Sequence, residues 1–233
     1  MKKIKVLIVD DSAVVRDILE KGLTLDPDIE VVGKASDVYF ARDLIVYNKP
    51  DVITLDVEMP KMNGVEFLKR LMPQYPLPVV MVSSLTEKNS EVTLAALEAG
   101  AIDFVLKPSS IDKNALKEMI IELIGKVKMA SRIDVSKFKD SKFSIDKIKD
   151  SNIHNRAIER IVAIGASAGG TVATKHIITQ FPKTMPGTVI VQHMPAGFTK
   201  SYAENLNKIS NVTVKEAQDG DRIEMGIAFI APG

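Results

Sequence analysis

The chain has 233 residues, of which 45% are apolar and none is cysteine, and a formal net charge of +1. This length suits one or two globular domains, and the lack of cysteine excludes a disulfide framework, a thiolate metal site and a cysteine nucleophile. The apolar runs are shorter than the ~20 residues that span a bilayer. The first run ends in Asp10 and Asp11 with no small-residue cleavage site, unlike a secretory signal. We therefore expect a cytoplasmic protein that does not insert into a membrane.

The charges are distributed unevenly along the chain. Basic and acidic residues number 15 and 20 in residues 1–125, 9 and 4 in residues 126–157, and 7 and 6 in residues 158–233. Binding to a phosphate backbone calls for clustered Lys and Arg, which the acidic first block lacks. The basic middle block has only Phe138 and Phe143 as aromatic platforms. We interpret it as a solvated linker and expect no nucleic-acid partner.

Residues 1–125 alternate short apolar runs with segments of helical spacing. Continuous apolar runs are typical of parallel strands buried on both faces. Five strand–helix units predict one doubly wound α/β domain with a five-stranded parallel sheet. Ser12 is expected to cap the first helix, Asn63 and Gly64 to mark the turn before the third, and Gly100 to end the fourth. The predicted elements are strands 5–9, 30–35, 51–55, 79–83 and 103–107, and helices 13–25, 38–47, 65–72, 90–99 and 113–126.

Beyond residue 125 the pattern is lost and then returns. Residues 126–157 contain no glycine or proline, and predict a charged, partly helical linker with a weak apolar stripe at Ile145, Ile148 and Ile153. Residues 158–233 predict a partial Rossmann-like parallel α/β domain, whose core is small for its class. Its predicted elements are strands 161–164, 189–192, 212–216 and 227–230 and helices 171–181 and 199–206.

Five polar residues stand at the ends of predicted strands in the first domain: Asp10, Asp11, Asp56, Ser83 and Lys107. Parallel strands bring their carboxyl ends to one edge of the sheet, where ligands bind. One such Asp is usually a helix cap and one such Ser a turn residue, but the five together favour a site. Two carboxylates about 4 Å apart repel by roughly 4 kcal/mol at a dielectric of ~20, so three need a cation besides Lys107. Oxygen ligands without His or Cys favour Mg²⁺ or Mn²⁺, and the set suits phosphoryl transfer to a carboxylate.

The second α/β block carries a candidate nucleophile. Residues 165–169 fit the pattern G-x-S-x-G, which exposes Ser167 on a sharp turn between a strand and a helix. The N–H groups of that helix would face a developing oxyanion. His193 ends the next strand and would serve as the base. Two alternatives stay open: residues 165–170 can equally be a phosphate-binding loop, and His193 can be a strand-end histidine bonded to a carbonyl.

Residues 1–125 resemble the receiver domain of two-component response regulators. The resemblance rests on the strand-end residues named above and on the junction Lys107-Pro108. It implies that Asp11, Asp56 and the backbone carbonyl of Glu58 hold Mg²⁺, and that Asp10 assists through a water molecule.

The same resemblance implies the roles of the other site residues. Asp56 would accept a phosphoryl group from a histidine kinase, and Ser83 and Lys107 would bind the phosphoryl oxygens. Phe104 occupies the position of the family's aromatic switch residue.

Residues 161–170, 189–206 and 214–233 resemble the catalytic domain of the chemotaxis-specific protein-glutamate methylesterases, which carry a receiver ahead of it. The resemblance implies that Ser167 and His193 are two members of a Ser-His-Asp triad. It also implies hydrolysis of glutamyl methyl esters and deamidation of glutamines on chemoreceptors, with no cofactor for hydrolysis. A chemotaxis histidine kinase would be the phosphodonor, and phosphorylation of the receiver would relieve inhibition of the output.

Two departures from this family affect the expected activity. The triad aspartate has no counterpart in the 233 residues, since Asp219 and Asp221 match a different turn, and Ala168 stands where many members have threonine. Loss of a triad aspartate costs about 10⁴-fold in kcat, so we expect little or no esterase activity from this chain. The alternative is a non-catalytic phosphoacceptor module that competes for the kinase or the receptors. Both alternatives predict phosphorylation of Asp56, but only the first lowers receptor ester content.

Overall fold

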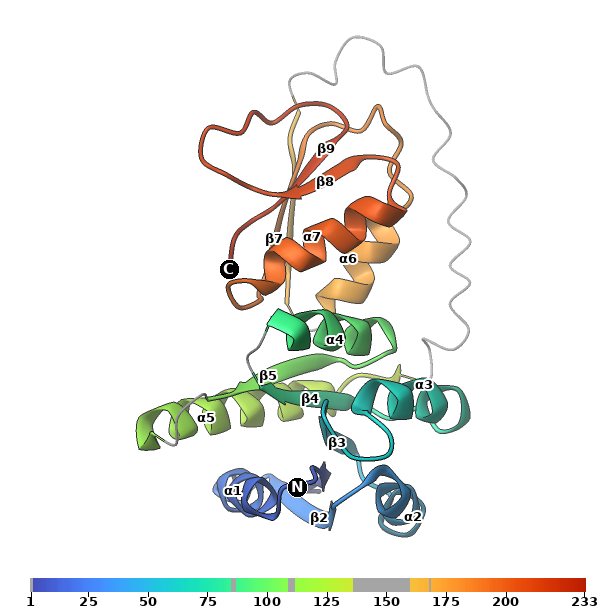
Figure 1. Cartoon of the computed structure of the whole chain (residues 1–233), viewed down its shortest axis with the longest axis vertical. Helices are drawn as coiled ribbons and strands as arrows, with labels where there is room; N and C mark the ends of the chain where they lie inside the picture. Colours follow the sequence, from blue (N-terminus) through green and yellow to red (C-terminus); the bar gives the residue numbers. More distant parts are fainter. Residues whose placement is uncertain (1, 85–86, 109–111, 136–159, 168) are drawn as a thin grey trace. The chain divides into compact units, whose positions relative to one another are not determined.

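The computed structural model describes residues 2–84, 87–108, 112–135, 160–167 and 169–233. The chain divides into two compact units, residues 1–140 and 141–233, which Figure 1 shows in colours that follow the sequence. The predicted stripe of three isoleucines in the linker and Ala168 lie outside the described residues. In the described part of the chain no helix is long and apolar enough to cross a membrane. The cytoplasmic location stays a prediction.

The first unit is the predicted doubly wound α/β domain. Its five strands form one parallel sheet in the order β2-β1-β3-β4-β5. Helices α1 and α5 lie on one face of this sheet, and α2, α3 and α4 lie on the other (Figure 1). The strands are β1 (Ile4–Val9), β2 (Ile29–Ala35), β3 (Val52–Asp56), β4 (Val79–Ser84) and β5 (Asp103–Lys107). The helices are α1 (Ala13–Leu23), α2 (Val38–Asn48), α3 (Gly64–Gln74), α4 (Glu87–Glu98) and α5 (Lys113–Ala130).

Local sequence signals place the ends of these helices. The Ser12 hydroxyl accepts a hydrogen bond from the Val15 N–H at the start of α1, and the Asn63 side chain accepts one from Glu66 at the start of α3. Gly100 has a φ of +110° just after α4, a conformation that side chains disfavour. The predicted cap at Ser12 and the predicted helix stop at Gly100 are confirmed, and Asn63, predicted as a turn residue, caps α3. All five residues of β3 are buried, as expected for a central strand covered on both faces.

Helix α5 is longer than the sequence pattern predicted. It continues to Ala130, beyond both the predicted helix end at 126 and the predicted domain end at 125. Val127 and Ala130 are fully buried, and Lys128 forms ion pairs with Asp26 (2.9 Å) and Asp28 (2.8 Å). These partners precede Lys128 by about one hundred residues, so the local pattern does not contain them. The division into residues 1–125, 126–157 and 158–233 stays a prediction.

The second unit is also a parallel α/β structure, as predicted. Its strands β6 (Val162–Ala166), β7 (Thr188–Gln192), β8 (Thr213–Glu216) and β9 (Ile227–Ile230) form a sheet in the order β6-β7-β9-β8. The helices are α6 (Gly170–Ile178) and α7 (Phe198–Ile209). The Tyr202 hydroxyl of α7 donates to the Thr171 carbonyl of α6, which joins the two helices. Residues of β6 alternate between half-buried and exposed, so this strand is less buried than β3.

Candidate functional site

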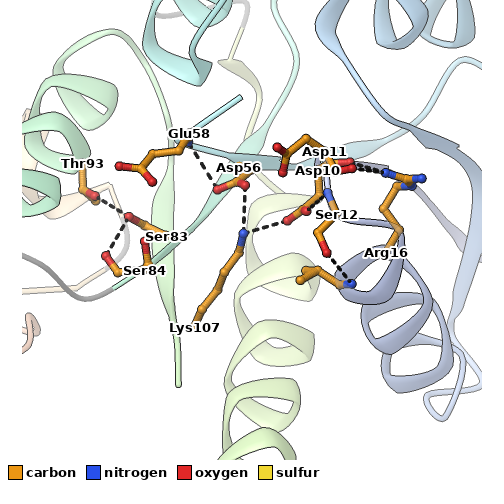
Figure 2. Close-up of polar contacts among 11 residues, drawn as sticks. Asp10, Asp11, Ser12, Arg16, Asp56, Glu58, Ser83, Ser84, Thr93 and Lys107 are labelled. Atoms are coloured by element: carbon orange, nitrogen blue, oxygen red, sulfur yellow. Dashed lines mark hydrogen bonds and ion pairs between the residues drawn. The ribbon is translucent and has the colours of Figure 1, made fainter. Parts of the chain in front are cut away.

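Three carboxylates meet at the carboxyl edge of the first sheet. Asp10 and Asp11 follow β1, and Asp56 is the last residue of β3. One oxygen atom from each side chain lies within 4.8 Å of the others. Asp10 and Asp56 are buried and Asp11 is exposed, so solvent reaches the cluster at Asp11. Figure 2 shows the three side chains. The structure thus brings together the three carboxylates that the sequence predicted.

Lys107, at the end of β5, joins two of these carboxylates. Its Nζ lies 2.8 Å from Oδ2 of Asp10 and 2.9 Å from Oδ2 of Asp56 (Figure 2). Oδ1 of Asp10 accepts a hydrogen bond from the Ser12 N–H at 2.9 Å. Oδ1 of Asp56 accepts a longer one, 3.4 Å, from the Glu58 N–H. These contacts fix the orientation of both buried carboxylates.

The cluster carries more negative than positive charge. Burial raises the pKa of Asp56 to about 6, and the charge of Asp10 adds to this effect, while Lys107 opposes it. Burial alone would lower the pKa of Lys107, but the charges of Asp56 and Asp10 outweigh burial and raise it. Lys107 therefore stays protonated. Its single positive charge does not balance three carboxylates.

The residues present fit a divalent cation. Three carboxylates each place an oxygen atom within 4.8 Å of the others, and Lys107 supplies one ammonium to two of them. Carboxylate and carbonyl oxygens are the ligands that hard cations such as Mg²⁺ take. A divalent ion would balance the surplus negative charge. The acidic residues whose oxygen atoms lie close enough to share such an ion are Asp10, Asp11 and Asp56.

Ser83 lies at the end of β4 and is fully buried. Its hydroxyl accepts a hydrogen bond from the Thr93 hydroxyl of α4 at 3.2 Å and donates one to the Ser84 carbonyl at 3.3 Å (Figure 2). Within the described ranges no hydrogen bond joins Ser83 to Asp56 or Lys107. The predicted phosphoryl-binding hydroxyl is therefore held toward α4.

Phe104, the predicted aromatic switch residue, is buried in β5. The ammonium of Lys126 lies 5.3 Å from the centre of its ring and donates a hydrogen bond to its backbone carbonyl. Helix α5 thus contacts both the ring and the backbone of this residue.

Several residues that shape the site were not predicted to do so from the sequence, although Gly64 was predicted as a turn residue. Arg16 donates to the backbone carbonyls of Asp10 (2.7 Å) and Asp11 (3.0 Å) and so fixes the loop that carries both. A Cβ atom at Gly64 would lie 2.2 Å from the carbonyl oxygen of Asp56, so only glycine fits there. The sequence did offer a signal for each of them. Arg16 is an arginine in the first turn of α1, and Gly64 is a glycine directly after the helix cap Asn63. Thr93 had a weaker signal, a polar residue at a core-facing helix position.

The second predicted pair lies on neighbouring strands. Ala166 of β6 pairs with Gln192 of β7, so Ser167 and His193 follow adjacent strand ends. Gln192 Nε2 donates to the Ser167 carbonyl at 2.9 Å, and the His193 N–H donates to the Ala166 carbonyl at 2.9 Å. Both residues are exposed. Among the residues with described positions, no hydrogen bond joins their side chains and no carboxylate contacts the His193 ring.

The alternatives left open for this region receive no support from the described contacts. The Gly170 N–H donates to the Ser167 carbonyl at 2.7 Å. This N–H group is therefore already hydrogen-bonded and does not point at a phosphate-binding position. No side-chain hydrogen bond from His193 to a carbonyl is found within the described positions.

Known proteins resemble the chain over its whole length. The family profile of the response regulator receiver domain matches residues 6–121, and that of the CheB methylesterase matches residues 162–233. A protein-glutamate methylesterase/protein-glutamine glutaminase of Syntrophotalea carbinolica is 58% identical over all of this chain and 67% of its own length. The chain belongs to this family. The counterpart from Sulfurimonas denitrificans is 51% identical over 99% of this chain and 67% of its own length.

A solved structure supports the assignment of the first unit. The crystal structure of the response regulator domain of Thermotoga maritima CheB is 43% identical, with a TM-score of 0.52, and covers 57% of this chain and 99% of that one. The predicted fold class, family and enzyme class are confirmed. The chain spans about two thirds of the length of the curated methylesterase/glutaminase relatives that it matches. Receiver domains in general bind a divalent metal, which agrees with the acidic cluster.

Proposed function

We propose that Asp56 accepts a phosphoryl group from a chemotaxis histidine kinase, with Mg²⁺ held by Asp11, Asp56 and the Glu58 carbonyl. Asp10 would assist through a water molecule. The observation that carries this proposal is the position of Lys107, within 2.9 Å of both Asp10 and Asp56 in a cluster of three carboxylates. A cation fixed between two buried carboxylates stays in place while the charge on one of them changes.

The chemistry follows from the residues around Asp56. A carboxylate oxygen of Asp56 attacks phosphorus, the P–N bond of phosphohistidine breaks, and its electron pair returns to the imidazole nitrogen. When bound, the divalent ion would neutralise charge on the transferring oxygens. Lys107 remains anchored by Asp10 and is free to pair with a phosphoryl oxygen. The Ser83 hydroxyl would donate to another oxygen after leaving its present partners.

Labelling with a small phosphodonor tests this proposal. With acetyl phosphate and Mg²⁺, we expect one phosphoryl group per chain, and none after Asp56→Asn. Asp43→Asn is the matched control, because Asp43 is exposed and pairs with Arg42 away from the cluster. Chelation of the metal should abolish labelling. Undiminished labelling of Asp56→Asn would refute the assignment.

The output reaction we propose is hydrolysis of glutamyl methyl esters on methyl-accepting chemoreceptors, with deamidation of glutamines as a second activity. The Ser167 hydroxyl would attack the ester carbonyl, His193 would take its proton, methanol would leave, and water would cleave the acyl-enzyme. Because no carboxylate in the described ranges contacts His193, we expect slow methanol release from the 233-residue chain. Release at a rate that Ser167→Ala abolishes would establish the role of Ser167.

A second candidate function is a phosphoacceptor module without esterase activity. The side chains of Ser167 and His193 are exposed and share no hydrogen bond in the described part of the chain, which favours this candidate. The two candidates differ in one measurement. A phosphorylated module without activity would bind kinase or receptor and leave the receptor methyl esters intact.

A further inference from the structure

The Ser83 hydroxyl is already engaged on the side of α4. Ser83 and Thr93 are both fully buried, and the Thr93 hydroxyl donates to Ser83 Oγ at 3.2 Å. The one proton of the Ser83 hydroxyl goes to the Ser84 carbonyl at 3.3 Å. Both distances exceed the usual 2.5–3.0 Å of hydroxyl hydrogen bonds, so these bonds are weak and can be exchanged. Figure 2 shows Thr93 and Asp56 on different sides of Ser83.

Thr93 is a polar residue in an apolar helix face. Leu94, Ala96 and Leu97 of α4 are buried with it, and Thr93, Ala96 and Leu97 have the spacing of one helix face. Water does not reach the Thr93 hydroxyl. Among the described residues its hydrogen-bond partner is Ser83. A buried hydroxyl that loses its hydrogen-bond partner costs free energy. A movement of Ser83 therefore changes the stability of α4 in its present position.

We propose that Thr93 is a positioning residue of the phosphorylation switch, which holds the Ser83 hydroxyl toward α4 until a phosphoryl group on Asp56 competes for it. The inference rests on the proposed function, in which Ser83 binds a phosphoryl oxygen. To donate to that oxygen, the Ser83 hydroxyl must give up the Ser84 carbonyl. Because Asp56 lies on the other side of Ser83 from Thr93 (Figure 2), the hydroxyl must also move away from Thr93. Either the Thr93 hydroxyl then loses its hydrogen bond to Ser83, or α4 moves together with Ser83. The Thr93–Ser83 hydrogen bond therefore opposes activation and couples it to α4.

Affinity for a phosphoryl analogue tests the inference. The probe is beryllium fluoride with Mg²⁺, titrated into the 233-residue chain and followed by fluorine NMR. Thr93→Val keeps the side-chain volume but removes the hydroxyl, so Ser83 is released. We expect it to lower the apparent Kd about five- to tenfold, the size of one lost hydrogen bond. Thr93→Ser keeps the hydroxyl and should stay within about twofold of the parent protein.

A second variant separates this coupling from a purely structural role. In the Ser83→Ala background, Thr93→Val should change the Kd less than about twofold, because the hydrogen bond is already absent. A full effect of Thr93→Val in that background, or an unchanged Kd in the parent background, overturns the inference. If Ser83→Ala itself leaves the Kd unchanged, the proposed role of Ser83 fails instead. Loss of binding in Asp56→Asn is the control for the site.

Discussion

At the scale of single residues, Asp56 is subject to two opposing effects. Burial raises its pKa to about 6, and the ammonium of Lys107 partly offsets this. An unperturbed aspartate has a pKa of about 3.9. The folded protein therefore binds more protons than the unfolded chain between about pH 4 and pH 6, and the free energy of unfolding falls as pH rises through this window. Above about pH 6, the free-energy cost of the ionised Asp56 in the folded protein no longer changes with pH.

Asp56→Asn should therefore stabilise the metal-free protein at neutral pH. The pKa difference corresponds to roughly 3 kcal/mol at about pH 7.5 and to about half of that at pH 5. The measurement is urea unfolding in the presence of a chelator at both pH values. A variant that is no more stable than the parent protein, or a gain that does not shrink at the lower pH, would contradict the account of Asp56.

Gly64→Ala tests the close approach beside Asp56. A Cβ atom there would lie 2.2 Å from the Asp56 carbonyl oxygen, so the loop after β3 must shift. We expect a loss of about 1–3 kcal/mol in the free energy of unfolding and slower labelling by acetyl phosphate. Gly125→Ala is the matched control, because nothing lies within 4 Å of a Cβ at this position of α5. The control should gain about 0.5–1 kcal/mol, and equal behaviour of the two variants would count against the argument.

At the scale of elements, Lys126 couples α5 to β5. Its ammonium pairs with Asp103 at 3.1 Å and with Glu122 at 2.8 Å, and it also contacts the ring and the carbonyl of Phe104. The side chains of Lys126 and Asp103 are only 11% and 13% exposed. Removal of one partner would leave the other charge largely buried. Loss of one member of this buried pair should therefore cost more stability than loss of one member of an exposed ion pair.

Lys126→Met should destabilise the first unit by about 2–4 kcal/mol, since it leaves Asp103 uncompensated. Addition of Asp103→Asn should recover part of this loss, so the double variant is less destabilised than the sum of the single changes. The exposed pair of Arg42 and Asp43 offers a comparison, and Arg42→Met should cost less than about 1 kcal/mol. Chemical unfolding of the parent protein, the two single variants, the double variant and Arg42→Met measures these differences. If the loss in the double variant equals the sum of the losses in the two single variants, Lys126 and Asp103 are not coupled.

At the scale of the whole molecule, the two units differ in how completely their sites are formed. In the first, residues at the ends of β1, β3 and β5 already make the contacts of a charged pocket. In the second, Ser167 and His193 occupy adjacent strand ends without a mutual hydrogen bond in the described part of the chain. We therefore expect phosphorylation to be the more readily detected activity of these 233 residues.

The sequence predicted most of the elements, because continuous apolar strands and capped helices leave local patterns. Asp10, Asp56 and Lys107 could be placed together because parallel strands end at one edge of the sheet. The extension of α5 could not be predicted, since it depends on Asp26 and Asp28 far along the chain. The contact of Thr93 with Ser83 depends on how α4 packs on the sheet, and no pattern within one element contains that information.

The central claim, that Asp56 is the phosphoacceptor, is tested most directly by locating the phosphoryl group. Labelling with acetyl phosphate and Mg²⁺, followed by borohydride reduction and peptide mass spectrometry, converts an aspartyl phosphate to homoserine at its position. We expect homoserine at residue 56 and unmodified aspartate at Asp10 and Asp11. Homoserine at another position, or none when metal and donor are present, would contradict the account.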